Sequence, residues 1–235
     1  MKLRVLGNNG PYPEAGQACS GYLIEKENSA FLMDCGSGVL SNLLKFKNLD
    51  QISFVVLSHL HFDHMSDILP LRYGLQVLKR KMDIYLPKSP KEVVELLKCD
   101  EFNLHFIDED YKIERDGFSL LFKRTEHPVE TYAIKVNNCF VYTADLAKWE
   151  PLVEFAKECK LLLADSAYLD KDKIEKPVHL TANECGILAK EAKVHQLLLT
   201  HFLPNSDRTL LLERAKSQFK NTNLALILES YPIQF

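Results

Sequence analysis

The chain has 235 residues, 46% of them hydrophobic and 26% charged, which is ordinary for a globular protein that forms one domain over residues 1–235. The formal net charge of −3 excludes a general affinity for polyanions, so extended nucleic-acid binding is not expected. The six cysteines are scattered and include no C-x-x-C pair, which predicts free thiols in a reducing compartment.

The chain carries no sign of export or of membrane insertion. It has no apolar run of 18 residues, and Gly7 and the asparagines after it end the first apolar run too early for a signal peptide. We therefore expect a cytoplasmic protein without a membrane partner.

Short apolar runs alternate with amphipathic segments along the whole chain, which is typical of an α/β or α+β fold. Strands are predicted, in chain order, over residues 3–6, 19–25, 30–33, 52–57, 82–86, 103–107, 118–123, 131–136, 140–143, 160–164, 197–200 and 224–228. Helices are predicted after Ser37 as an N-cap and over residues 68–78, 91–97, 151–158, 181–193 and 208–218. Thr181 and Glu184 have the spacing of a capping box.

The most informative motif follows directly after the predicted strand 52–57. It has the form H-x-H-x-D-H and contains His59, His61, Asp63 and His64. Burying so many polar groups without partners would cost several kcal/mol, so a metal ion is the natural partner. Imidazole and carboxylate ligands suit zinc first, with manganese or iron as alternatives.

Other ligand-type residues also come where predicted strands end. Asp145 follows the strand 140–143, His201 follows the strand 197–200, and His127 closes the strand that begins at residue 118. In sheets flanked by helices, sites gather at the carboxyl ends of the strands. We therefore expect these residues to lie near the histidine motif.

Together these residues predict a site for two divalent metal ions. We assign His59, His61 and His127 to one ion, and Asp63, His64 and His201 to the other, with Asp145 as a bridge. Two such ions can hold a bridging hydroxide as a nucleophile near neutral pH, and Asp63 can orient that hydroxide.

With these motifs the sequence resembles the metallo-β-lactamase fold superfamily. The match covers the H-x-H-x-D-H motif, the isolated His127, the segment Tyr142-Thr143-Ala144-Asp145 and the segment Leu-Thr-His201-Phe. The resemblance implies a four-layer αββα sandwich with a dinuclear, usually zinc, site at one edge.

Within the superfamily the chain looks most like the ribonuclease Z-type phosphodiesterase branch. Its segment 33–38 resembles the glycine turn of that branch, and His179-Leu180-Thr181 resembles its H-x-T segment. The resemblance makes His179 a histidine that assists proton transfer to the leaving oxygen and is not a ligand. It places Asp165 where the tRNA-processing enzymes carry a glutamate, either as a site group or as a helix cap. In such a glycine turn we expect Asp34 to be structural, with its carboxylate accepting hydrogen bonds from loop amides.

The leading hypothesis from the sequence is a metal-dependent phosphodiesterase that acts on a small molecule, a nucleotide or a short RNA. The chain has no long basic arm of the kind that grips tRNA. The same nucleophile can attack carbon, so a carboxyl-ester, lactone or thioester hydrolase is an alternative, and a metal-binding protein without turnover is another. Members of the branch are often homodimers, and Leu75, Val77 and Leu78 offer an apolar face for that contact.

Overall fold

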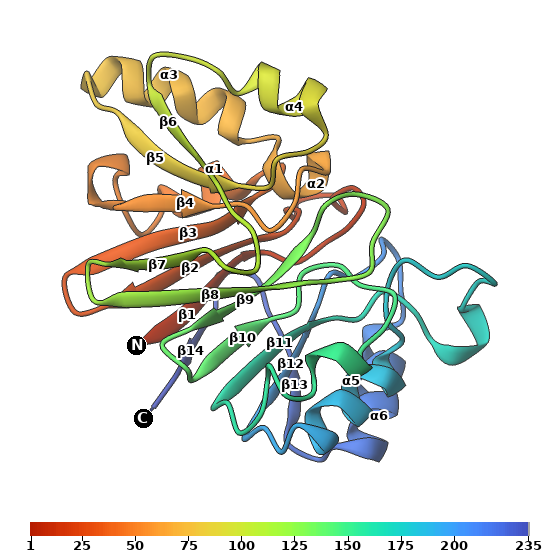
Figure 1. The fold of residues 1–235 in the computed structure, drawn as a ribbon. Coiled ribbons are helices and arrows are strands. Elements are labelled where there is room, and N and C mark those ends of the chain that lie inside the picture. Colours follow the sequence, from red (N-terminus) through yellow and green to blue (C-terminus); the bar gives the residue numbers. More distant parts are fainter. Residues whose placement is uncertain (235) are drawn as a thin grey trace. The chain divides into compact units, whose positions relative to one another are not determined.

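The computed structural model describes residues 1–234, and Figure 1 shows its elements. The chain forms two compact units. The first consists of Met1–Ile107 and Leu226–Pro232, and the second of Asp108–Ala225 with the residues after Pro232. Each unit contains one mixed sheet, and its helices pack on one face of that sheet.

The described part of the first unit has a sheet of seven strands in the order β14-β1-β2-β3-β4-β5-β6. Its strands are β1 (Lys2–Gly7), β2 (Gly21–Lys26), β3 (Ser29–Cys35), β4 (Phe54–Val56), β5 (Met82–Leu86), β6 (Phe102–Phe106) and β14 (Ser230–Pro232). Its helices are α1 (Val39–Leu43), η1 (Leu49–Gln51), α2 (Phe62–Met65), α3 (Ile68–Leu78) and α4 (Lys91–Leu96). Strands β3 to β6 run parallel to one another.

The core of the first unit lies between these helices and one face of the sheet. Helix α3 contributes Ile68, Leu71 and Leu75, which are spaced by three or four residues and are fully buried. This spacing places them on one stripe of the helix.

The described part of the second unit has a sheet of seven strands in the order β13-β12-β11-β10-β9-β8-β7. Its strands are β7 (Lys112–Arg115), β8 (Phe118–Arg124), β9 (Tyr132–Val136), β10 (Phe140–Tyr142), β11 (Leu161–Asp165), β12 (Leu197–Thr200) and β13 (Thr222–Leu224). Its helices are η2 (Glu150–Leu152), η3 (Asp170–Asp172), α5 (Ala182–Glu191) and α6 (Arg208–Gln218). Strands β10 to β13 are parallel, so their carboxyl ends meet at one edge.

Helices α5 and α6 pack closely because α5 carries a glycine at their contact. A Cβ atom on Gly186 would lie 2.6 Å from the carbonyl oxygen of Ala215, closer than real Cβ contacts come. Leu188 of α5 and Leu211 of α6 are buried in the same core with the strand residue Leu199. This core supports strands β11 and β12 from one face.

Several predicted elements are confirmed with their bounds, among them the helices 68–78 and 208–218 and the strands 82–86 and 197–200. The capping box of Thr181 and Glu184 is also confirmed. The N-cap assigned to Ser37 is wrong, because Gly38 occupies that position with a φ of 88° and provides no side-chain cap.

Two predicted elements are wrong, and several short ones were missed. The segment 151–158 is a set of turns whose hydrogen bonds run mainly between residues three apart, and only its start belongs to η2. The predicted strand 224–228 is replaced by a turn between β13 and β14, where Leu228 has a φ of 70°. Strands β7 and β14, the short helix α2 and the single turns η1 and η3 were not predicted.

All six cysteines are free thiols, as the sequence predicted. Burial raises the pKa of Cys35 and of Cys185 well above its ordinary value. These thiols are therefore protonated in the folded protein and behave as small apolar side chains.

Candidate metal centre

The histidine motif of the first unit lies in the segment between β4 and α2. The Nε2 atom of His59 is 3.1 Å from the Nδ1 atom of His61. Asp63 and His64 lie in α2, which has His61 as its N-cap, and both are buried. The structure therefore brings the four predicted ligands of this motif together in two pairs.

The carboxylate of Asp34, at the end of β3, holds this segment in place. It accepts hydrogen bonds from the backbone N–H of Ser58 (2.7 Å), from the Ser58 hydroxyl (2.8 Å) and from Nδ1 of His64 (2.8 Å). Asp34 is fully buried and has a φ of 57°, a left-handed conformation that costs about 1–3 kcal/mol in a residue other than glycine. The prediction that it accepts loop amides is confirmed, and the bond to His64 was not anticipated.

These hydrogen bonds fix the tautomers of two histidines. His64 donates through Nδ1 to Asp34, so in its neutral form Nε2 carries the lone pair. The only hydroxyl proton of Ser58 goes to Asp34, so Ser58 Oγ accepts from Nδ1 of His59 at 3.1 Å. Nε2 of His59 is thereby also left as a lone-pair donor for a metal ion.

The ligand-type residues of the second unit are supplied by the carboxyl edge of its parallel strands. Asp165 is the last residue of β11, His201 comes directly after β12, and Asp145 follows three residues after β10. His201 and Ala144 have left-handed backbone conformations, with φ values of 58° and 53°. These turns redirect the chain where each strand ends.

The buried carboxylate of Asp145 is the centre of this group. Its Oδ2 atom lies 3.7 Å from Nε2 of His127 and 3.5 Å from Nε2 of His201. The hydroxyl of Thr125 donates to the backbone carbonyl of Asp145 at 2.9 Å, which holds the turn. Asp145 thus lies between two predicted ligands of different ions, as a bridging residue requires.

His179 and Asp165 form a second pair beside Asp145. Nδ1 of His179 donates to Oδ2 of Asp165 at 2.9 Å and lies 3.8 Å from Oδ2 of Asp145. Oδ1 of Asp165 is 3.5 Å from Nδ1 of His201. The cap of α5 is Thr181, so of the two roles left open for Asp165 the structure supports the site group.

The charges of this pair favour a protonated histidine. Burial acts to lower the pKa of His179, but the carboxylates of Asp165 and Asp145 outweigh it and raise the pKa above its ordinary value. Burial likewise acts to raise the pKa of Asp165, and His179 and His201 reverse this effect, so the pKa is lowered. The pair is therefore stabilised as imidazolium and carboxylate.

The donor set of both groups fits divalent metal ions. His127 donates through Nδ1 to the carbonyl oxygen of Val178 at 3.0 Å, so its Nε2 lone pair is on the side of Asp145. In the same way the Nε2 lone pair of His64 is on the side of Asp63, at 3.6 Å from Oδ2. A lone pair and a carboxylate repel unless a cation lies near both. Two ligands about 2.1 Å from a tetrahedral zinc ion are about 3.4 Å apart, close to the spacings found here.

In the second unit, one ligand atom from each of Asp145, Asp165, His179 and His201 lies within 4.8 Å of the others. The sequence alone leaves the role of Asp165 open, and it does not reveal that Asp34 contacts the predicted ligand His64. The position of Asp165 at the end of a strand next to that of His201 was the available signal.

Comparison with known proteins identifies the family. Residues 29–202 match the family described as the beta-lactamase superfamily domain. The probable metallo-hydrolase YhfI of Bacillus subtilis (strain 168) is 34% identical over 93% of this chain and 94% of its own length. The chain belongs to the beta-lactamase superfamily.

A solved structure and a second relative agree with this membership. The crystal structure of the metallo-beta-lactamase fold protein YhfI from Bacillus subtilis superposes with a TM-score of 0.94 and 31% identity, over 98% of both chains. The ribonuclease Z of Methanosarcina acetivorans is 25% identical over 96% of this chain and 95% of its own length. The predicted resemblance and the predicted α/β fold of the metallo-β-lactamase type are confirmed.

The structure also bears on the predicted membrane and dimer contacts. Within residues 1–234, every helix is too short or too polar to cross a bilayer. Leu75 was predicted to be part of an exposed apolar face, but it is buried in the core of the first unit. The apolar residues that α3 exposes on one stripe are Leu69, Tyr73 and Val77.

Proposed function

We propose that this protein is a metal-dependent hydrolase and that its substrates are phosphodiesters: a nucleotide, a short RNA or a small molecule. The observation that carries the proposal is the ion pair of His179 and Asp165 beside Asp145. A buried histidine whose pKa is raised by two neighbouring carboxylates is suited to donate a proton to a leaving oxygen. The relationship to ribonuclease Z supports a phosphodiester as the substrate.

We further propose two divalent ions, with zinc as the first choice, held by the set predicted from the sequence. That set is His59, His61, Asp63, His64, His127, Asp145 and His201. When bound, such ions polarise the phosphoryl group and make water a stronger nucleophile. We also propose that the two units act as one functional domain in a cytoplasmic protein. The exposed residues Leu69, Tyr73 and Val77 of α3 offer a contact for a homodimer.

The residues of the chain have separate tasks in this reaction. Asp63 orients the attacking water and takes its proton, and the water oxygen forms a bond to phosphorus. The bond from phosphorus to the leaving oxygen breaks, and that oxygen takes the proton of His179. Asp165 holds the ring of His179 through Nδ1, so the proton that is transferred is the one on Nε2.

The test is hydrolysis of bis(p-nitrophenyl) phosphate by the full chain reconstituted with zinc or with manganese. We expect turnover that is lost in Asp63→Ala and Asp145→Ala and much reduced in His179→Ala. His195→Ala is the matched control, because His195 is exposed and precedes β12, at the opposite end of that strand from His201. Metal-loaded protein that hydrolyses lactones or thioesters and leaves phosphodiesters intact would favour the acyl hydrolase.

A further inference from the structure

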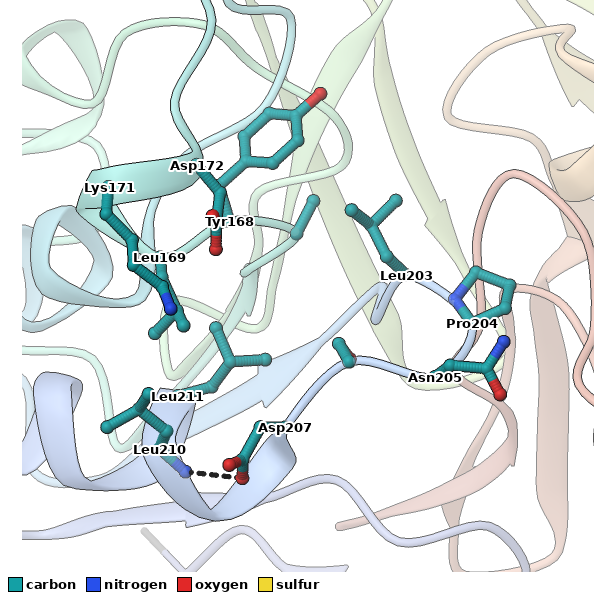
Figure 2. Close-up of a pocket in the computed structure, with 12 residues that line it drawn as sticks. Tyr168, Leu169, Lys171, Asp172, Leu203, Pro204, Asn205, Asp207, Leu210 and Leu211 are labelled. Atoms are coloured by element: carbon teal, nitrogen blue, oxygen red, sulfur yellow. Dashed lines mark hydrogen bonds between the residues drawn. The ribbon is translucent and has the colours of Figure 1, made fainter.

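The second unit contains a cavity of about 340 Å³ beside the candidate site (Figure 2). Its walls come from the chain that leaves β11 and η3 and from the chain that leaves β12 and begins α6. The volume is at the small end of ligand pockets, which span about 300–1,000 Å³, so it suits one part of a ligand.

The walls of the cavity are mostly apolar. Leu169, Leu203, Leu210 and Leu211 line it together with Pro204. Figure 2 shows these side chains around the same space, with Asp207 turned to cap the N–H of Leu210 at 3.0 Å. A surface of this kind favours the faces of a flat ring over a charged or strongly hydrated group.

A few polar residues also line the cavity, among them Lys171, Asp172 and Ser206. The Oγ atom of Ser206, which lines the cavity, is buried and makes no hydrogen bond to any residue that the structure describes. A buried hydroxyl without a partner is costly, so a ligand with a polar edge would be favoured here. Mostly apolar walls with a few polar groups match a heteroaromatic or polar-substituted ring.

The cavity connects to the proposed proton donor through Tyr168. Tyr168 lines the cavity, and its ring meets the ring of His179 edge to face, with centroids 5.9 Å apart. Leu203, on the opposite wall, follows His201 by two residues. The cavity is therefore on the side of the candidate site where His179 would protonate a leaving oxygen.

We propose that this cavity binds a ring carried by the leaving group of the substrate. The leaving alcohol is then a nucleoside or an aryl alcohol, and Leu203 and Leu210 select for it against small polar alcohols. This inference rests on the proposed phosphodiesterase function, because that function defines which alcohol is the leaving group. The ring-binding cavity itself does not depend on turnover.

Binding is tested first, without catalysis. The full chain, with ¹³C-labelled leucine methyl groups, is titrated with p-nitrophenol and separately with methyl phosphate. We expect p-nitrophenol to shift the methyl signals of Leu203, Leu210 and Leu211, and methyl phosphate to leave them unchanged. Ser206→Ala should weaken binding severalfold. An absence of shifts at these leucines would overturn the ring-binding cavity, even in an active enzyme.

The leaving-group assignment is tested by kinetics with methyl p-nitrophenyl phosphate, whose only ring is on the leaving group. We expect Leu203→Ala and Leu210→Ala to lower kcat/KM at least about tenfold, with unchanged metal content and thermal unfolding. Ile174→Ala is the control, because Ile174 is exposed in the same unit and does not line the cavity.

Two outcomes separate this inference from the function on which it rests. Variants that hydrolyse bis(p-nitrophenyl) phosphate more slowly, but hydrolyse methyl p-nitrophenyl phosphate at the wild-type rate, would assign the cavity to the retained group. This result would overturn the leaving-group assignment. A wild-type protein without phosphodiesterase activity would refute the proposed function and this assignment, while the methyl titration would still decide whether the cavity binds a ring.

Discussion

The two groups of ligand-type residues are built in different ways. In the first unit, His59, His61, Asp63 and His64 come from one continuous segment, and one buried carboxylate, Asp34, holds it. In the second unit, residues far apart in sequence meet because parallel strands end at one edge. The first group therefore depends on a local hydrogen-bond network, and the second depends on strand register and on left-handed turns.

The largest expected effect concerns the second unit. Replacing His179 by alanine should lower kcat by about 10²–10⁴-fold, the usual contribution of a general acid, without loss of metal. The loss should be greater for a methyl phosphodiester with a poor leaving group than for a p-nitrophenyl ester, because p-nitrophenolate is a good leaving group and depends less on a proton donor. Equal losses for both esters would instead assign His179 to substrate or metal binding.

The corresponding change in the first unit should act on metal binding. In Asp34→Asn only one of the two side-chain atoms can accept hydrogen bonds, so either the backbone N–H of Ser58 or the pair of donors on Ser58 Oγ and His64 Nδ1 loses its acceptor, and the segment that carries His64 shifts. We expect metal affinity to fall about 10–100-fold, as for other residues that orient ligands. Competition with a chromophoric chelator measures the affinity.

Asp83→Asn is the matched control for Asp34→Asn. Asp83 pairs with Nε2 of His105 at 3.0 Å in the same unit and outside the histidine motif. Metal affinity that falls equally in both variants would show that Asp34 acts through general stability and not through His64.

Substitutions at two glycines test whether packing affects the two groups differently. A Cβ atom on Gly36 would lie 1.9 Å from the carbonyl oxygen of Asp63, so Gly36→Ala must displace the histidine motif. We expect a destabilisation of about 1–3 kcal/mol together with weaker metal binding. Gly186→Ala should cost a similar amount by separating α5 from α6 and should leave metal affinity unchanged. Denaturant unfolding and chelator competition together distinguish the two.

The smallest expected effect concerns helix caps. Oγ1 of Thr181 accepts from the N–H of Glu184 at 3.2 Å, so Thr181→Ala should lower the free energy of unfolding by about 0.5–2 kcal/mol. Ser37→Ala should change it by less than about 0.5 kcal/mol, because the exposed Ser37 is not a cap in the folded protein. A larger effect at Ser37 would contradict the cap at Gly38.

Elements that are marked by a pattern within a short stretch of sequence could be predicted from the sequence alone. Helix α3 could be predicted with its bounds because its apolar residues repeat at helical spacing, and α5 because Thr181 and Glu184 mark its start. The H-x-H-x-D-H motif stood out for a similar reason, since its four residues lie within one short segment.

Features that depend on contacts between residues far apart in sequence could be recognised only in the folded structure. The segment 151–158 has an apolar pattern suited to a helix, but short helices are marginal alone, and turns place Ala156 and Cys159 in the core. The hydrogen bond from His64 to Asp34 joins residues 30 positions apart, and that from His179 to Asp165 joins residues 14 apart. No local pattern encodes such pairs, because strand register and left-handed turns bring them together only after the sheets have formed.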